Sequence, residues 1–525
     1  MSIARFGGLK RKFAGALVGG GLLLGLPLVS SAQSVPSYVI STFAGTGAND
    51  AEEFAGDDGP ATSAQLNNPY SIAIDSAGNV YIADQVHHRI RKVSTAGIIT
   101  TIAGTDTASW TGDDAVATSA TLNAPCGLLV DSAGDIYIAD TLNHVIRKIT
   151  ASTGKISTFA GTNVAGFSGD GDGVDDGEDE TDPVATSAQL NRPTSLARDS
   201  KGNLYIADTY NSRIRKILAS NSTIDTVVGD GAQRRYGDGG IATSASVFDP
   251  QGIAFDAAGN LFIADTNNHV IRKATPRSDG EFDIQTVAGS GVYGYTGDEI
   301  PATQASLFYP KWVAVDTAGN LFIADSFNMR IRMVTTDGII HTIAGNGTYG
   351  LSGDGGPAID AELRFPSSVT LGSGGKIYVT DNQNHRIALL TPVVDLGLSA
   401  PTSLNLGGKQ YVNAVLDDNQ TLVLPTDALA GTASRPARIG ETVTMFANGL
   451  GDTDEQVNDT LSRIRIYFGH LAAEVSLAGD AGDGSGAKRL NVVVPNIEDN
   501  DAIPVMLFKD GTVAQKAIYT AVRSN

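Results

Sequence analysis

The chain has 525 residues, a formal net charge of −20 and a single cysteine. This length allows two or three domains, and the 61 glycines are typical of a protein with many tight turns. The negative charge argues against nucleic acid as a partner, because the chain repels a phosphate backbone. Cys126 cannot form an internal disulfide, so the stability must come from a packed core.

The first 32 residues have the parts of a secretory signal peptide. A basic start, with Arg5 and residues 10–12, precedes an apolar run over residues 13–29, and residues 30–32 are small, as a cleavage site requires. Removal of residues 1–32 takes away four positive charges and changes the net charge from −20 to −24. No segment is long enough for a membrane span, and we expect a secreted, periplasmic or cell-envelope protein.

A short apolar phrase that ends in Asp occurs six times along the chain. Its final residues are 56, 68, 57, 60 and 56 positions apart, and they are Asp84, Asp140, Asp208, Asp265, Asp325 and Asp381. A repeat of this length, rich in short apolar strands, is typical of stacked or radially arranged units.

Each repeat reads as four short strands joined by turns. In the first repeat the predicted strands are residues 71–75, 80–84, 89–93 and 98–102, with turn residues between them. Four antiparallel strands with short turns form one blade of a β-propeller. The sequence therefore predicts an all-β fold with a six-bladed propeller over residues 38–391.

The last repeat lacks its fourth strand. Its predicted strands are residues 368–371, 377–380 and 386–390, and Pro392 then interrupts the pattern. Residues 38–44, near the start of the mature chain, match the fourth strands of the other repeats. We predict that they complete the last blade and close the ring, which hides the edges of an open array.

Two recurring phrases resemble the NHL-repeat family. The string Ile-Ala-Asp-x-x-Asn-His-x-Ile-Arg-Lys occurs at Ile138–Lys148 and Ile263–Lys273, and Gly-Asp-Asp-Gly-Pro-Ala-Thr-Ser-Ala-Gln-Leu occurs at residues 56–66 and recurs in degraded form. Together they resemble the NHL domain of teneurins and of many secreted bacterial proteins, over residues 38–391. The resemblance implies a binding or scaffolding module more often than an enzyme.

The C-terminal part has a different pattern. A linker is predicted over residues 392–407, followed by short strands at intervals that suggest a β-sandwich over residues 408–525. Residues 435–444 and 491–496 resemble an immunoglobulin-like C-terminal domain that occurs in large secreted proteins of Acidobacteria. This resemblance implies an architecture and no known chemistry.

Two sets of polar residues repeat on one face of the predicted ring, where the long connections between blades meet the turns between second and third strands. Imidazoles that converge on an axis could hold a metal, and an amidating-lyase branch of NHL-like propellers uses zinc-bound His. The regular spacing instead favours hydrogen bonds in the turns, and the six Asp residues are expected to accept the backbone N–H groups that follow them. The His set is His88, His144, His269 and His385.

An acidic insertion lengthens the connection before the third blade. Its alternating Asp and Gly residues could wrap oxygen ligands around calcium, although the pattern departs from an EF-hand loop. The alternative is a solvated loop. The possible calcium ligands are Asp170, Asp172, Asp175 and Asp176.

An aromatic residue stands before the Gly-Asp of most connections. Such rings could stack on sugars, or they could pack as wedges between the blades. These loop aromatics are Phe54, Trp110, Phe167, Tyr236 and Tyr295.

The repeats differ where each innermost strand begins, after the Pro that starts the blade. These positions should line the rim of the central channel, and we predict them as the place where a small ligand binds. They are Tyr70, Cys126, Thr194, Gln251, Lys311 with Trp312, and Ser367. A second departure is Arg198 in an inner strand, which should find a carboxylate partner if it is buried.

The sequence favours a non-enzymatic module that binds a protein or a carbohydrate on the face with the long connections. No catalytic signature is present, since Gly-x-Ser-x-Gly, His-Glu-x-x-His and Cys-x-x-Cys are all missing. The alternative is a metal-dependent lyase or hydrolase at the mouth of the channel.

Overall fold

The computed structural model describes residues 35–47, 54–170 and 183–393, and beyond them only the backbone of strands between residues 404 and 523. The predicted signal peptide over residues 1–32 lies outside this part, and so does most of the predicted linker over residues 392–407.

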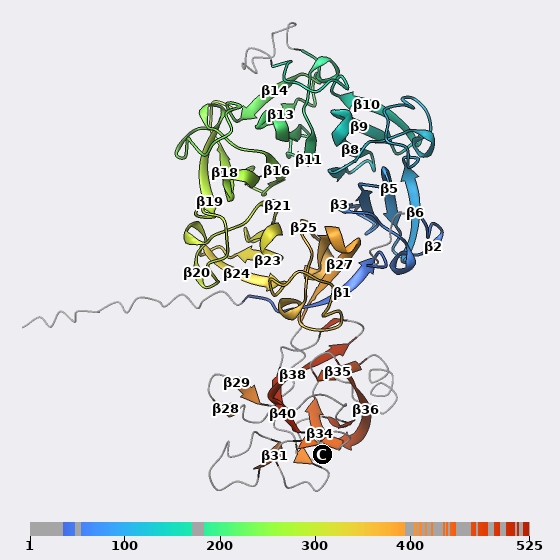
Figure 1. The fold of residues 1–525 in the computed structure, drawn as a ribbon, viewed down its shortest axis with the longest axis vertical. Coiled ribbons are helices and arrows are strands. Elements are labelled where there is room, and N and C mark those ends of the chain that lie inside the picture. Colours follow the sequence, from blue (N-terminus) through green and yellow to red (C-terminus); the bar gives the residue numbers. More distant parts are fainter. Residues whose placement is uncertain are drawn as a thin grey trace, which may run out of the picture. The chain divides into compact units, whose positions relative to one another are not determined.

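Six antiparallel blades form a ring around a central axis (Figure 1). The ring confirms the predicted all-β six-bladed propeller. From the innermost strand outward, the first three blades are β3 (Pro69–Ile74), β4 (Val80–Asp84), β5 (Arg89–Val93) and β6 (Ile98–Ala103); β7 (Leu128–Val130), β8 (Ile136–Asp140), β9 (Val145–Thr150) and β10 (Lys155–Ala160); and β11 (Pro193–Arg198), β12 (Leu204–Asp208), β13 (Arg213–Ile217) and β14 (Ile224–Val228).

The last three blades repeat this arrangement. They are β16 (Pro250–Phe255), β17 (Leu261–Asp265), β18 (Val270–Pro276) and β19 (Phe282–Ala288); β21 (Pro310–Val315), β22 (Leu321–Asp325), β23 (Arg330–Val334) and β24 (Ile339–Ala344); and β25 (Pro366–Leu371), β26 (Ile377–Asp381), β27 (Arg386–Pro392) and β1 (Tyr38–Ala44).

The N-terminal strand closes the ring, as predicted. β1 pairs antiparallel with β27, from Tyr38 opposite Pro392 to Ala44 opposite Ile387. In Figure 1 the blue β1 lies beside the orange β27. Ile40, in the middle of β1, is fully buried, so the closing strand is part of the core and not a loose cover.

Short elements decorate the connections and the turns. Three two-residue strands pair with outer strands; they are β2 (Gly59–Pro60), β15 (Gly240–Ile241) and β20 (Ile300–Pro301). Six 3-10 turns end the connections, each with its first Ala buried: η1 (Ala61–Ser63), η2 (Ala117–Ser119), η4 (Ala185–Ser187), η6 (Ala242–Ser244), η8 (Ala302–Gln304) and η10 (Ala358–Asp360). Others follow second strands or, in one case, a first strand: η3 (Thr141–Asn143), η5 (Thr209–Asn211), η7 (Thr266–Asn268), η9 (Ser326–Asn328), η12 (Asn382–Asn384) and η11 (Ser373–Gly375).

The hydrophobic core lies between neighbouring blades. Second strands such as β4 bury every residue, because β-branched and aromatic side chains cover both faces of the sheet. In one cluster, Tyr81 and Ile90 of the first blade pack with Ile138 and Ile156 of the second. Each blade is therefore stable only against its neighbours, which explains why ring closure matters.

The C-terminal part contains further paired strands. Val415 pairs antiparallel with Leu422. The strands are β28 (Leu404–Leu406), β29 (Lys409–Tyr411), β30 (Val415–Leu416), β31 (Leu422–Val423), β32 (Ser434–Arg435), β33 (Ala437–Arg438), β34 (Thr442–Ala447), β35 (Ile464–Phe468), β36 (Leu471–Asp480), β37 (Lys488–Val493), β38 (Asn500–Lys509), β39 (Thr512–Val513) and β40 (Ile518–Arg523). The immunoglobulin-like sandwich stays a prediction.

Among the described residues, no helix is long and apolar enough to cross a membrane.

Candidate functional site

Each blade contains a buried arginine between two aspartates, which we call the Asp–Arg–Asp unit. The Asp at the end of the second strand lies 2.9–3.6 Å from the guanidinium. A second Asp, from the Gly-Asp of the connection, lies 2.6–2.8 Å from it. The arginines are almost fully buried, and they are Arg91, Arg147, Arg215, Arg272, Arg332 and Arg386.

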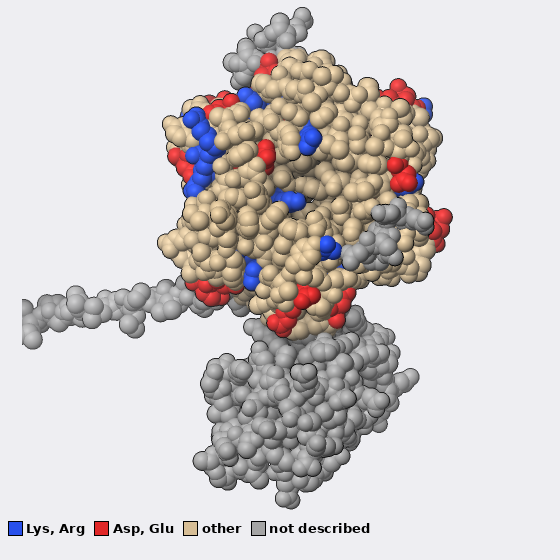
Figure 2. Space-filling view, in the orientation of Figure 1, with Lys and Arg blue, Asp and Glu red and all other residues tan. Residues whose placement is uncertain are grey.

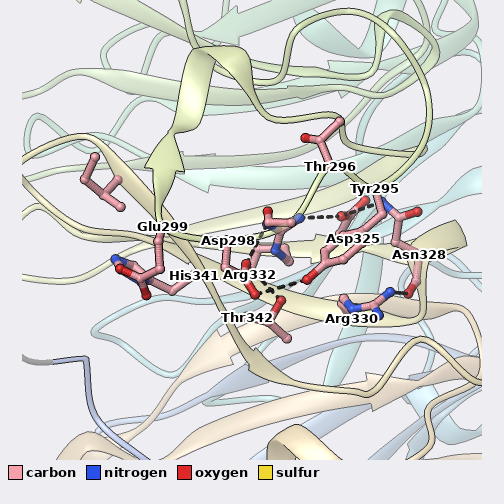
Figure 3. A network of polar contacts seen from close by, with 12 residues as sticks. Tyr295, Thr296, Asp298, Glu299, Asp325, Asn328, Arg330, Arg332, His341 and Thr342 are labelled. Carbon is pink, nitrogen blue, oxygen red and sulfur yellow. Dashed lines mark hydrogen bonds and ion pairs between the residues drawn. The ribbon is translucent and has the colours of Figure 1, made fainter. Parts of the chain in front are cut away.

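The fifth blade shows how this unit ties strands to connections (Figure 3). Arg332 pairs with Asp325 at 3.3 Å and with Asp298 at 2.8 Å. The amide of Asn328 donates to Asp325 at 2.8 Å. The backbone N–H of Phe308, 17 residues before Asp325, also donates to it at 2.8 Å. The expectation that these Asp residues accept the N–H groups that follow them was therefore wrong, because the carboxylate holds the start of its own blade instead.

Burial shifts the proton affinity of the strand-end carboxylates. It raises the pKa of Asp140 to about 7 and that of Asp208, Asp265 and Asp325 to about 6. Backbone N–H groups, Asn amides and the paired arginines act in the opposite direction. All six carboxylates lie beside the buried arginine and accept a backbone N–H from the start of their own blade, and Asp84 contacts His87 where the other five accept from an Asn amide. The structure therefore gives them one shared role in the framework.

The four histidines lie in the turns after the second strands, each with a positive φ of 51–57°. Their Nδ1 atoms accept backbone N–H groups from the start of the next blade: Ala124 for His88, Arg192 for His144, Tyr309 for His269 and Asn68 for His385, at 3.0–3.2 Å. In the fifth blade the Sδ of Met329 accepts the N–H of Phe365 at 3.2 Å. A thioether can take the place of imidazole here because the position requires an acceptor.

Burial lowers the pKa of these four histidines, which keeps the accepting ring neutral. Within the described parts of the chain, no group of three or more His, Cys, Asp or Glu side chains is arranged to hold a metal ion. The Nδ1 atoms are already engaged in joining neighbouring blades.

Several of the loop aromatics lie over the arginine that begins the third strand and, at a greater distance, over the buried arginine of the same blade. The guanidinium of Arg89 lies 3.7 Å from the ring of Phe54, that of Arg213 3.8 Å from Phe167, and that of Arg330 3.9 Å from Tyr295. Arg234 lies farther from Tyr236, at 5.2 Å, and the indole N–H of Trp110 donates to Thr158. These contacts favour the wedge interpretation, although rings such as Phe167 remain 40% exposed.

Only one of the predicted calcium ligands lies in the described residues. Asp170 is the connection carboxylate of the third blade, and it pairs with Arg215 at 2.6 Å and accepts a hydrogen bond from Thr226. Asp172, Asp175 and Asp176 lie outside the described residues, so the calcium interpretation stays a prediction.

The channel-rim residues form a side-chain bar near the axis. The hydroxyl of Tyr70, in the first blade, donates to Oε1 of Gln251 in the fourth blade, so the two reach across the channel. The ammonium of Lys311 lies 5.8 Å from the ring of Tyr70. Ser367 donates to the backbone oxygen of Tyr70 at 2.7 Å. The bar therefore connects two blades that face each other across the axis.

The other rim residues are more enclosed. Trp312 packs in a hydrophobic cluster that also contains Tyr70 and Cys126, and Thr194 shares a hydrogen bond with Thr209 at 2.6 Å. Burial raises the pKa of the Cys126 thiol to about 11, so it is protonated and a poor nucleophile at neutral pH. Lys311 and Gln251 remain half-buried, which makes them the most accessible rim side chains.

A continuous aromatic band crosses the last three blades. Tyr309 lies 4.8 Å from both His269 and Phe327, and Phe327 lies 4.7 Å from Phe365, measured between ring centroids. Tyr293 and Tyr349 extend the two ends and are 67% and 47% exposed. We call this set the aromatic band; its members are His269, Tyr293, Phe308, Tyr309, Phe327, Tyr349 and Phe365.

Sequence reasoning missed most of the aromatic band, because it compared the residues after the blade-starting Pro and not the two before it. At the positions of Phe308 and Tyr309 the first blade has Asn67 and Asn68. The position of Phe327, whose backbone N–H donates to the oxygen of Phe308, is Leu142 in the second blade. Aligning these positions across the repeats would have shown an excess of rings in the last three blades.

Arg198, at the far end of its innermost strand from the channel rim, has the carboxylate partner that was predicted for it. This side chain pairs with Asp131 at 2.8 Å and donates to the backbone oxygen of Gly202 at 2.8 Å. It also lines a small pocket with Tyr137 and Leu218. The prediction of a carboxylate partner is confirmed, and Arg198 has a structural role between two blades.

These features define a β-propeller whose blades are fixed by repeated polar units and differ at the channel mouth. The Teneurin NHL domain family matches residues 35–111, 112–218 and 290–352, and the NHL repeat family matches residues 363–388. The chain therefore contains an NHL-repeat β-propeller of the teneurin NHL type.

Curated relatives and solved structures agree with this class. NHL repeat-containing protein 2 of Homo sapiens is 27% identical over 61% of this chain and 46% of its own length. Teneurin-1 of Homo sapiens is 27% identical over 67% of this chain and 13% of its own. This chain spans less than half the length of these relatives. A crystal structure of an auxiliary nutrient binding protein from Bacteroides thetaiotaomicron has the same fold, with a TM-score of 0.50, 14% identity and coverage of 68% of this chain and 77% of that one.

Proposed function

We propose that this protein is a non-enzymatic binding module that holds a protein or carbohydrate ligand on the face with the long connections. The observation that carries the proposal is the aromatic band. Exposed and half-buried aromatic residues that contact each other over three blades form a platform of the kind on which ligands stack.

The framework residues support this proposal by their regularity. Every blade uses its Asp–Arg–Asp unit for the same structural task, and four blades use a His to hold the next blade. A catalytic centre needs different residues in different roles around one point. The feature that differs from blade to blade is the surface around the channel mouth, which suits selective binding.

The sequence suggests where this binding module would act and which partners it would not bind. The predicted signal peptide would direct the protein to a secreted, periplasmic or cell-envelope location, and the predicted immunoglobulin-like part would act as a spacer or adhesive module. The net charge of −20 disfavours nucleic acid as a partner.

A matched pair of variants tests the proposal. Phe327→Ser removes the central ring of the aromatic band, whereas Leu142→Ser changes the equivalent position of the second blade; the two side chains are 39% and 40% exposed. The full chain and both variants would be applied to a glycan array and used in cell-surface pull-downs. We expect a wild-type ligand whose binding falls at least about tenfold in Phe327→Ser and is unchanged in Leu142→Ser. Equal binding by both variants, or no ligand in either assay, would contradict the proposal.

A further inference from the structure

Lys311 is a cation without a carboxylate partner in the described residues. Its side chain is half-buried at the channel mouth, and its ammonium lies 5.8 Å from the centre of the Tyr70 ring. Burial lowers the pKa of the ammonium, while the nearby Cys126 acts in the opposite direction. Removing a charge from water costs free energy unless another charge offsets the loss, so this lysine is suited to an anion from outside.

The Tyr70–Gln251 bar lies beside Lys311 near the axis of the ring. It joins the first and fourth blades, which face each other across the channel. Lys311 is the second residue of the innermost strand of the fifth blade, and its ammonium lies 5.8 Å from the ring of Tyr70. A ligand that enters from the face with the long connections therefore meets Lys311 next to this bar.

The aromatic band comes close to Lys311 in the chain. Tyr309 stands two residues before Lys311, and it contacts His269 and Phe327 of the aromatic band. Aromatic faces stack on flat groups that present C–H bonds, and sugar rings present such faces together with hydroxyl groups. The tyrosines of the band supply polar tips that can hydrogen-bond to those hydroxyls.

The charge around the mouth complements an anion, although the chain as a whole is acidic. Figure 2 shows Lys and Arg side chains beside a hollow at the centre of the ring, together with an acidic side chain, while the other Asp and Glu side chains lie toward the outer edge. Across the mouth from the aromatic band, Arg192 lies 4.4 Å from the ring of Tyr210 and donates to its hydroxyl. Such a distribution attracts negatively charged ligands toward the centre.

We propose that the channel mouth binds a sugar that carries a carboxylate, such as a uronic acid unit. Lys311 would pair with the carboxylate, and the aromatic band would stack on the sugar ring. The single charge of a carboxylate matches the ammonium of Lys311, and the sugar ring that carries it matches the aromatic band. This inference rests on the proposed function and names the ligand class for it.

The test compares tri-galacturonic acid with a neutral trisaccharide by calorimetric titration of the full chain. We expect the wild-type protein to bind the acidic sugar about tenfold more tightly, with a preference that weakens as salt increases. Lys311→Met should abolish the preference and Lys311→Arg should keep it, and thermal melting checks that both variants are folded. Phe327→Ser should weaken the binding of both sugars.

The outcomes separate this inference from the proposed function. Equal affinity of the wild-type protein for the two sugars, or an unchanged preference in a folded Lys311→Met variant, would overturn the uronic acid assignment. If neither sugar binds but a protein ligand from the pull-down depends on Phe327, the inference fails and the proposed function stands. If no ligand depends on Phe327, both fail.

Discussion

The second and fifth blades contain the same buried Asp–Arg–Asp unit but present different residues at the channel mouth. Arg147 and Arg332 each lie between two aspartates at similar distances. At the channel mouth, the second blade presents Ala124 and Leu142, whereas the fifth presents Tyr309 and Phe327. The repeated residues therefore build the ring, and the positions where the blades differ are available to recognise a ligand.

The largest expected effect comes from breaking one repeated unit. In Arg272→Met, the carboxylate of Asp265 stays buried without its cation, which should lower the free energy of unfolding by about 3–5 kcal/mol. Urea unfolding measures the loss. The control is Arg277→Met, because Arg277 pairs with Asp279 on the surface, where we expect no measurable change. Equal losses in the two variants would show that the buried unit has no special role.

A smaller effect should follow from removing one aromatic cover. Phe167→Ala takes away the ring that lies over Arg213 and Arg215, and we expect a loss of about 1 kcal/mol. Val164→Ala, at an exposed position of the same connection, should have little effect. If Phe167→Ala leaves stability unchanged but weakens ligand binding, the ring belongs to the binding surface and not to the framework.

The smallest effect concerns the pH dependence of stability. The four turn histidines have a lowered pKa in the folded protein, so the unfolded chain takes up protons first as the pH falls below about 6.5. Their contribution to stability is therefore present at neutral pH and is lost on acidification. The buried Asp residues with a raised pKa act in the opposite sense, since their contribution is lost as the pH rises toward 6–7.

A histidine-free variant isolates the first contribution. Met329 already replaces His in one blade, so the change of His88, His144, His269 and His385 to Met keeps an acceptor without a titrating group. Thermal melts between pH 7.5 and 5.5 should show a smaller loss on acidification in this variant than in the wild-type protein. The same loss of thermal stability in the variant and the wild-type protein would mean that these histidines do not control stability at acidic pH.

The sequence predicted the blades and their closure well, because both depend on local patterns. The phrase that ends in Asp fixes the register of each blade, and residues 38–44 could be matched to the missing fourth strand and form β1. The partners of Asp84 could not be predicted in the same way. Arg91 lies across a strand pair, and Asp57 comes from a connection 34 residues before Arg91, so the contact exists only after the sheet forms.

The aromatic band was harder to predict because it crosses blade boundaries. Tyr309 and His269 are 40 residues apart, and their rings meet only when neighbouring blades pack side by side. That Lys311 has no carboxylate partner among the described residues depends on the same packing. The repeats in the sequence therefore revealed the framework, whereas the residues that meet at the channel mouth could be identified only from the structure.

Binding and unfolding measured together for Phe327→Ser and Phe167→Ala distinguish the recognition surface from the framework. On the glycan array, we expect the signal of Phe327→Ser to fall at least about tenfold while its urea unfolding matches that of the wild-type protein. We expect Phe167→Ala to keep the signal and to unfold more easily. The reverse pattern, with binding lost in Phe167→Ala and retained in Phe327→Ser, would contradict the division between a repeated framework and a recognition surface on the last three blades.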